Sequence, residues 1–203
     1  HPFMKHIVIL ISGSGSNMAA IVRRSQQGDW ARRLDARIVA VISNRPDAAG
    51  LALAREQGIA TEVLDHRAFD SREAFDSALA GRIEAHQASL VVLAGFMRIL
   101  TPAFVARFDG RLINIHPSLL PKYQGLHTHE RALQAGDREA GCTVHEVTRA
   151  HGRCTVVAAA SSAITLRESR SVTGTTSPEA SARSVAPSGR SVSRKRASET
   201  RMS

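Results

Sequence analysis

Hydrophobic positions along the chain fall into short continuous runs separated by amphipathic stretches. Predicted strands lie at residues 6–11, 36–42, 60–64, 89–95 and 111–115, and the runs at 6–11 and 89–95 are apolar at nearly every position. Continuous apolar runs of this kind are typical of parallel strands that are covered on both faces. The stretches between them carry helix start and end signals and predict helices at residues 18–27, 48–57, 72–85 and 101–108. This alternation predicts an α/β fold with a Rossmann-like, doubly wound and mainly parallel sheet.

The pattern changes toward the end of the chain. Residues 127–135 predict a further helix, and residues 141–148 alternate with period two, as a strand does. Residues 149–203 contain no Phe, Tyr or Trp and are dominated by Ser, Arg, Ala and Thr. Such a composition buries too little apolar surface to offset the entropy lost on ordering. We therefore expect one domain over residues 1–148, and a basic tail that is disordered beyond a short strand at 155–159.

The formal net charge of +9 is unevenly distributed. Residues 149–203 hold ten Lys or Arg and three Glu, so the tail carries +7 and the first 148 residues carry only +2. A nucleic-acid partner is therefore not indicated for the predicted domain. A tail that binds nucleic-acid phosphates around residues 194–196 is an alternative that ranks behind disorder and an out-of-frame origin.

Two features predict the compartment. Cys142 and Cys154 make neither a disulfide framework nor a zinc-binding pattern. No apolar run reaches transmembrane length, and no signal-peptide pattern is present. We expect a cytoplasmic protein with reduced thiols and no membrane partner. The sequence does not specify the oligomeric state.

Candidate chemistry lies at the ends of two predicted strands. Asn114 and His116 are two residues apart, so both side chains leave one face of a strand, and Pro117 then ends the strand. The Gly/Ser-rich loop at residues 12–17 joins another strand to a helix, and its backbone N–H groups suit a phosphate. The plainer alternatives are a Pro-bounded turn and a capped tight turn. The loop matches neither a P-loop nor Gly-x-Gly-x-x-Gly, so ATP and NAD are not supported.

Three histidines, His127, His129 and His145, are candidates for a metal site. His-x-His at the start of a helix does not place both rings on one face, and no acidic ligand accompanies the pair. Structural or substrate-lining roles are therefore favoured, and no metal is predicted.

Three separated motifs carry a family resemblance. They are Ile-Ser-Gly-Ser-Gly-Ser-Asn at 11–17, Ala-Gly-Phe-Met-Arg-Ile-Leu at 94–100 and Asn-Ile-His-Pro-Ser-Leu-Leu-Pro at 114–121. In this order they resemble the folate-dependent glycinamide ribonucleotide formyltransferases, and the resemblance runs from about Lys5 to Thr148. It implies transfer of the formyl group of 10-formyltetrahydrofolate, as a cosubstrate, to the amine of glycinamide ribonucleotide in de novo purine biosynthesis.

The resemblance also implies residue roles. By position, Gly15, Ser16 and Asn17 would hold the substrate phosphate, and Asn114 and His116 would be the catalytic pair. The folate-binding residues would be Arg72, Met97, Arg98, Ile99, Leu100 and Asn114.

The chain departs from the family after Thr148. The family continues with an acidic loop whose aspartate partners the catalytic histidine, then a strand and a long helix. Here Gly152 stands at the aligned position, and no Asp occurs after Asp137. We interpret the tail as an out-of-frame translation and expect severely reduced activity. Sequencing the coding DNA tests this, because the shifted frame past codon 148 should resume a family-like strand and helix.

Other functions remain open at this point. Formyltetrahydrofolate hydrolase and methionyl-tRNA formyltransferase share the Asn-x-His-Pro site. The first would carry an additional N-terminal domain, and the second a C-terminal domain with its own core, so neither fits well. A non-catalytic nucleotide-binding remnant is the alternative from a different class.

Overall fold

The computed structural model describes residues 4–120, 122, 127–137, 139–148, 153–163 and 200–201. Its strands are β1 (Lys5–Ile11), β2 (Ala36–Ser43), β3 (Ala60–Val63), β4 (Ala88–Leu93), β5 (Leu112–His116), β6 (Glu139–Glu146), β7 (Arg153–Ala163) and β8 (Thr200–Arg201). Its helices are α1 (Ser16–Gln27), α2 (Trp30–Arg33), α3 (Gly50–Glu56), α4 (Arg72–Ala85), α5 (Pro102–Arg107) and α6 (Thr128–Gln134), with a 3₁₀ turn η1 (His66–Ala68).

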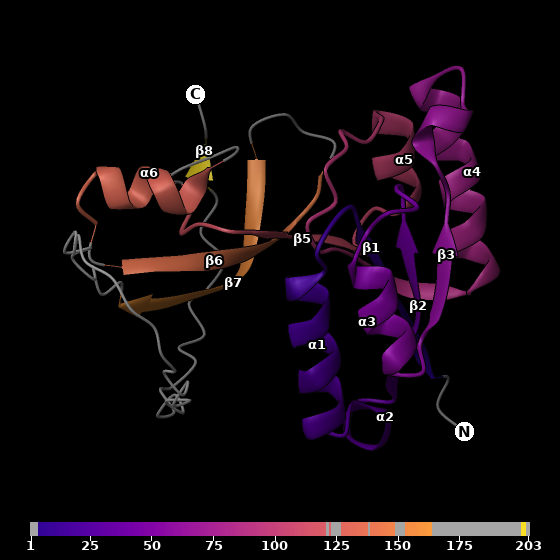
Figure 1. The fold of residues 1–203 in the computed structure, drawn as a ribbon, viewed down its shortest axis with the longest axis horizontal. Helices are drawn as coiled ribbons and strands as arrows, with labels where there is room; N and C mark the ends of the chain where they lie inside the picture. The colour runs from indigo at the N-terminus through magenta and orange to yellow at the C-terminus, as the bar shows by residue number, and fades with distance from the viewer. Residues whose placement is uncertain are drawn as a thin grey trace, which may run out of the picture.

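The strands form one mixed sheet in the order β3-β2-β1-β4-β5-β6-β7-β8. The strands from β3 to β5 in this order pair in parallel. Strands β6, β7 and β8 then continue the sheet in antiparallel fashion. In Figure 1, β6, β7 and α6 lie to one side of the parallel part, and β5 lies between the two parts. The predicted Rossmann-like, mainly parallel architecture is confirmed.

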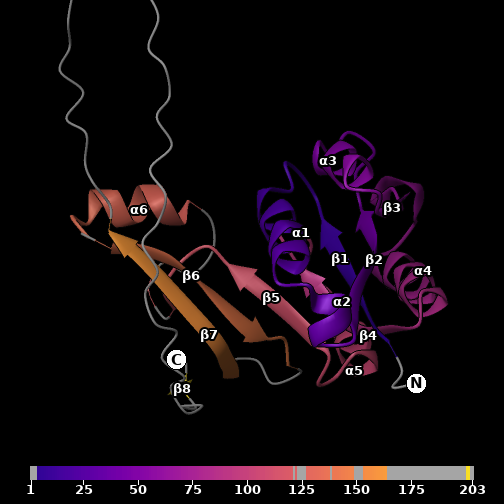
Figure 2. The same ribbon diagram turned by 90° about the horizontal axis from the view of Figure 1, so that it is seen from below.

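Two hydrophobic cores cover opposite faces of the parallel part. On β1, Val8 and Leu10 belong to one core, which packs under α4 and α5. Ile7, Ile9 and Ile11 belong to the other, which packs under α1 and α3 (Figure 2). Because successive side chains of a strand point to opposite faces, a strand between two helix layers must be apolar at every position. This explains the continuous apolar runs of the sequence.

Element boundaries differ from the predictions by a few residues at most. Helix α4 begins and ends where predicted. Helix α1 begins at residue 16, two residues early, because Gly15 adopts the left-handed conformation that starts it. Helix α3 begins at Gly50, two residues late.

The expected short strand at 155–159 is longer in the structure. Strand β7 covers residues 153–163 and pairs along nearly its whole length with β6, with Glu139 opposite Ala163 and Glu146 opposite Thr155. The outer edge of β6 offers a row of N–H and C=O groups, and pairing with it satisfies the backbone of a segment that has little core of its own. The expected disorder of residues 149–152, 164–199 and 202–203 lies outside the described residues.

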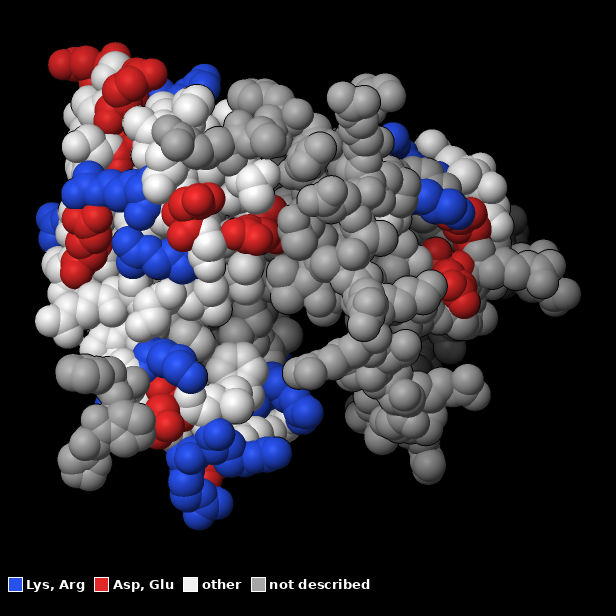
Figure 3. Space-filling model, turned by 180° about the vertical axis from the view of Figure 1, so that it is seen from behind, with Lys and Arg blue, Asp and Glu red and all other residues white. Residues whose placement is uncertain are grey.

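The surface of the described part carries both charge signs. In the face drawn in Figure 3, acidic and basic side chains lie next to one another over much of the parallel part. Among the described residues, no helix is both long and apolar enough to cross a membrane.

Candidate active site

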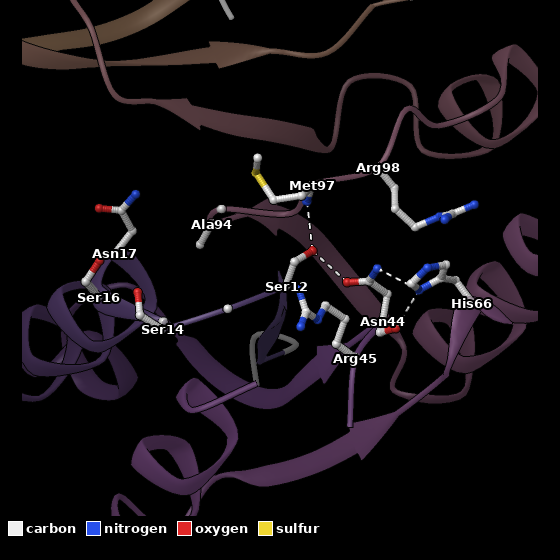
Figure 4. Close-up of a pocket in the computed structure, with 13 residues that line it drawn as sticks. Ser12, Ser14, Ser16, Asn17, Asn44, Arg45, His66, Ala94, Met97 and Arg98 are labelled. Atoms are coloured by element: carbon white, nitrogen blue, oxygen red, sulfur yellow. Dashed lines mark hydrogen bonds between the residues drawn. The ribbon is translucent and has the colours of Figure 1, made fainter. Parts of the chain in front are cut away.

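A cavity of about 410 Å³ opens at the carboxyl ends of β1, β2 and β4. It is lined by Ser12, Gly13, Ser14, Gly15, Ser16, Asn17, Asn44, Arg45, His66, Ala94, Gly95, Met97 and Arg98. Ligands of open α/β sheets bind at this edge, outside the carboxyl ends of the strands. All three predicted phosphate-binding residues therefore lie in one cavity, at the N-terminus of α1 (Figure 4).

The start of α1 is shaped by a close glycine contact. Gly15 has φ +72°, and a Cβ on it would meet Gly50 Cα at 2.7 Å. The N–H of Gly50 donates to Gly13 O over 3.0 Å, which ties the loop to the start of α3. No side chain caps α1, so the first N–H groups of the helix remain available to a phosphate in the cavity.

A buried network joins the loop to two neighbouring segments. Ser12 Oγ donates to Asn44 Oδ1 over 2.6 Å and accepts from the N–H of Met97 over 2.8 Å. His66 Nδ1 lies 2.9 Å from the backbone carbonyl oxygen of Asn44 and 3.2 Å from the side-chain Nδ2 of Asn44. Figure 4 shows these contacts running from Met97 through Ser12 and Asn44 to His66, all of which line the cavity.

A second cavity of about 440 Å³ lies beside β5. It is lined by Arg72, Leu93, Phe96, Arg98, Ile99, Leu100, Pro102, Val105, Asn114, His145, Val147 and Thr148. Arg98 lines both cavities, so the two adjoin at this residue. The guanidinium of Arg98 lies 4.9 Å from the centroid of the buried Phe75 ring, which holds it in place by a cation–π contact.

The predicted folate-binding residues divide between the cavities. Arg72, Arg98, Ile99, Leu100 and Asn114 line the second cavity. Met97 lines the first one instead and is 63% exposed. The structure thus gathers most of these residues around the second cavity, while Met97 lines the loop cavity.

Asn114 and His116 stand on one face of β5, as their spacing predicts. In the antiparallel register, Asn114 lies opposite His145 of β6, and His116 lies opposite Thr143. Asn114 Nδ2 is 3.1 Å from His145 Nε2. His145 Nδ1 is 3.2 Å from Glu146 O.

The protonation of His145 follows from its surroundings. Burial lowers the pKa of the His145 imidazole and the nearby His116 lowers it further, while the hydrogen bond to Glu146 O opposes both. A neutral ring with its proton on Nδ1 donates to Glu146 O and leaves Nε2 to accept from the Asn114 amide. This fixes the orientation of the Asn114 amide.

Sequence reasoning did not assign a functional role to Asn44, Arg45, His66 or the Asn114–His145 pair. The signal for the first two was the polar Ser-Asn-Arg-Pro-Asp turn after the predicted strand at 36–42. The carboxyl ends of neighbouring parallel strands meet at one edge, so this turn had to lie beside the loop after β1. The pairing of Asn114 with His145 depends on the register of β5 and β6, which no local pattern specifies.

The other candidate residues lie away from these cavities or outside the description. His127 is exposed and pairs with Glu130 at 3.2 Å, so the expectation that no acidic side chain accompanies the His-x-His pair is wrong. Within the part of the chain that the structure describes, no three His, Cys, Asp or Glu side chains come together as metal ligands. Gly152 lies outside the described residues.

With the fold and the two adjoining cavities in view, the chain belongs to the formyl transferase family, whose model matches residues 5–175. Among its relatives, phosphoribosylglycinamide formyltransferase of Escherichia coli is 54% identical over 143 residues, covering 70% of this chain and 66% of that protein. The trifunctional purine biosynthetic protein adenosine-3 of Drosophila melanogaster is 48% identical over 143 residues, covering 70% of this chain and 10% of that protein.

A solved structure shows the same fold. The phosphoribosylglycinamide formyltransferase of Coxiella burnetii, in complex with CHES, matches with a TM-score of 0.72 and 48% identity, covering 81% of this chain and 75% of that one. The predicted family is thereby confirmed. The chain matches just under two thirds of the E. coli protein and a tenth of the Drosophila protein.

Proposed function

We propose that this chain derives from an enzyme that transfers the formyl group of 10-formyltetrahydrofolate to the amine of glycinamide ribonucleotide. One observation carries the proposal: a loop cavity at a helix N-terminus adjoins a second cavity that contains Asn114, and Arg98 lines both. A two-substrate transfer needs such adjoining sites, because the attacking amine and the formyl carbon must meet. The names of the relatives favour this reaction over the hydrolase and the tRNA enzyme.

The ribonucleotide phosphate would bind Gly15, Ser16 and Asn17, where the N–H groups of α1 face the cavity. The folate would lie in the second cavity, against Arg72 and the segment 98–100. Both substrates are small molecules, and the proposal includes neither a metal nor a membrane or nucleic-acid partner. It places the protein in the cytoplasm.

The chemistry would pass through a tetrahedral intermediate whose oxygen carries negative charge. Asn114, held by His145, would donate an N–H to this oxygen. Protonated His116 would stabilise the same charge and carry the proton from the attacking amine to the departing folate nitrogen. The formyl carbon gains the bond to the amine and loses the bond to the folate nitrogen.

The proposal includes a large loss of activity in this chain. No aspartate follows Asp137, so the carboxylate that partners the histidine in the family has no counterpart in the sequence. The proposed domain, residues 1–148, keeps the phosphate loop and the Asn114–His116 pair, and β7 continues its sheet, but the proposal includes no counterpart of the family's acidic loop and long helix. A non-catalytic nucleotide-binding remnant is the second candidate, and the missing aspartate is what favours it.

The test compares the native chain with a restored chain, in which residues after 148 are replaced by the corresponding part of the E. coli relative. We expect the restored chain to form formylglycinamide ribonucleotide rapidly and the native chain to form it slowly, with similar nucleotide affinity. A restored chain that folds and binds both substrates without transfer would overturn the proposed reaction. A native chain without any transfer, but with nucleotide bound, would establish the remnant.

A further inference from the structure

The loop between β4 and α5 is held at both ends by buried side chains from other segments. At its start, the Ser12 hydroxyl accepts from the N–H of Met97 over 2.8 Å. At its end, the Asp76 carboxylate of α4 accepts from the N–H of Thr101 over 2.7 Å. Ser12 and Asp76 are only 4% and 3% exposed. Between these fixed points Ile99 is 75% exposed, so the side chains that line the second cavity project from a short segment clamped at its two ends.

The two clamps differ in what they connect. Asp76 belongs to a helix on one face of the sheet and has no part in the phosphate loop. Ser12 is the first residue of that loop, and its own N–H donates to Gly95 O over 3.1 Å. Ser12 therefore contacts the β4–α5 loop with both its backbone and its side chain.

The Ser12 hydroxyl has a single orientation. It donates to Asn44 Oδ1 over 2.6 Å, which leaves its lone pairs for the N–H of Met97. Asn44 is itself only 3% exposed, and His66 Nδ1 contacts both its side-chain Nδ2 and its backbone carbonyl oxygen. Because the Ser12 hydroxyl and the Asn44 amide both already have partners, a movement of the phosphate loop displaces the hydroxyl and with it the backbone at Met97.

We propose that Ser12 is a positioning residue that couples the two substrate sites. Phosphate binding orders the loop at residues 12–17 and thereby fixes the Met97 backbone, and this holds the segment 98–100 in the conformation that binds folate. This inference rests on the proposed function, since it names the energetic link between the two sites of that reaction. By linkage, the coupling is reciprocal, so folate binding strengthens nucleotide binding by the same factor.

The experiment measures tetrahydrofolate binding to the native chain with and without saturating glycinamide ribonucleotide, a pair that cannot react. The variants are Ser12→Ala, its matched control Ser25→Ala, and Asp76→Ala. Ser25 Oγ donates to Val22 O within α1, so the control removes one hydroxyl hydrogen bond away from both cavities. Amide exchange at Met97 and Thr101 is recorded for each protein.

We expect the nucleotide to strengthen tetrahydrofolate binding about five-fold or more in the native chain and in Ser25→Ala. In Ser12→Ala this factor should fall close to unity, and exchange at Met97 should accelerate. In Asp76→Ala, exchange should accelerate at Thr101, folate affinity should fall, and the coupling factor should persist. A general loss of structure would weaken tetrahydrofolate binding equally with and without the nucleotide, so the coupling factor would not change.

Equal coupling in Ser12→Ala and Ser25→Ala would overturn the inference, as would equal exchange at Met97 in these two variants. A native chain that binds neither ligand overturns the proposed function and the coupling with it. The exchange rates still decide whether Ser12 holds Met97, so the two failures can be distinguished.

Discussion

Replacement of Gly15 by alanine should destabilise the protein through two separate effects. The first is local, because Gly15 has φ +72° and an L side chain in the left-handed region costs roughly 1–2 kcal/mol. The second is a backbone clash, since the new Cβ would lie 2.7 Å from Gly50 Cα, against an ordinary carbon–carbon contact of about 3.5–4.0 Å. Gly50 is backbone at the start of α3 and cannot rotate away, so we add about 1–3 kcal/mol for displacement of packed groups.

The sum for Gly15→Ala is roughly 2–5 kcal/mol, a large part of the total stability of about 5–15 kcal/mol that is usual for such a domain. Gly58→Ala is the matched control, because Gly58 has φ +70° and nothing lies within 4 Å of its ideal Cβ. The control should lose only the left-handed contribution, about 1–2 kcal/mol. Urea unfolding at equilibrium measures both, and an unchanged m-value shows that midpoint shifts report stability.

The same substitution should weaken binding of a phosphate-bearing ligand more than Gly58→Ala does, because the loop must move away from α3. The reasoning is refuted if Gly15→Ala and Gly58→Ala lose equal stability, since the contact with Gly50 would then contribute nothing.

Three further predictions follow from the site and core. Because burial lowers the pKa of His145, the unfolded chain binds more protons than the folded chain between that lowered value and the ordinary 6.5. Stability should therefore rise with pH through this window and be lost as the pH falls through it, and urea unfolding of His145→Gln should lack this contribution; identical slopes would contradict the assignment. Phe75→Ala removes a fully buried ring from the core under α4 and should cost about 3–5 kcal/mol in the same assay. The exposed Val63→Ala should stay within about 0.5 kcal/mol, and similar losses for the two would refute the burial argument. Arg72→Ala should weaken tetrahydrofolate binding about ten-fold or more, since Arg72 lines the second cavity, and should leave nucleotide affinity unchanged. Arg82→Ala on the same helix is the control. If Arg72→Ala weakened tetrahydrofolate and nucleotide binding equally, a folate-side role of Arg72 would be contradicted.

Much of the fold could be predicted because its strands carry a strong local signal. A strand such as β1 lies between two helix layers, so Val8 and Ile9 are both buried although they face opposite sides. Helix α4 was predicted to the residue because Ser71 caps it by accepting from the N–H of Ala74. Local chemistry of this kind is visible in the sequence.

Features that depend on distant partners could not be predicted. The full length of β7 follows from the edge of β6, not from its own pattern. Met97 lines the loop cavity and not the second cavity, and its N–H donates to Ser12, a contact between residues 85 positions apart that no local pattern indicates. The contact between Asn114 and His145 arises from an antiparallel register that brings together residues 31 positions apart.

The most direct test of the central claim is formyl transfer by the restored chain and by its His116→Ala and Asn114→Ala variants, with nucleotide affinity measured on the same preparations. The account predicts similar nucleotide affinity in all three proteins. Loss of a donor to the developing oxyanion, or of the proton carrier, should lower turnover about 100-fold or more in each variant. Turnover in His116→Ala equal to that of the restored chain would contradict the assignment of the reaction to this pair.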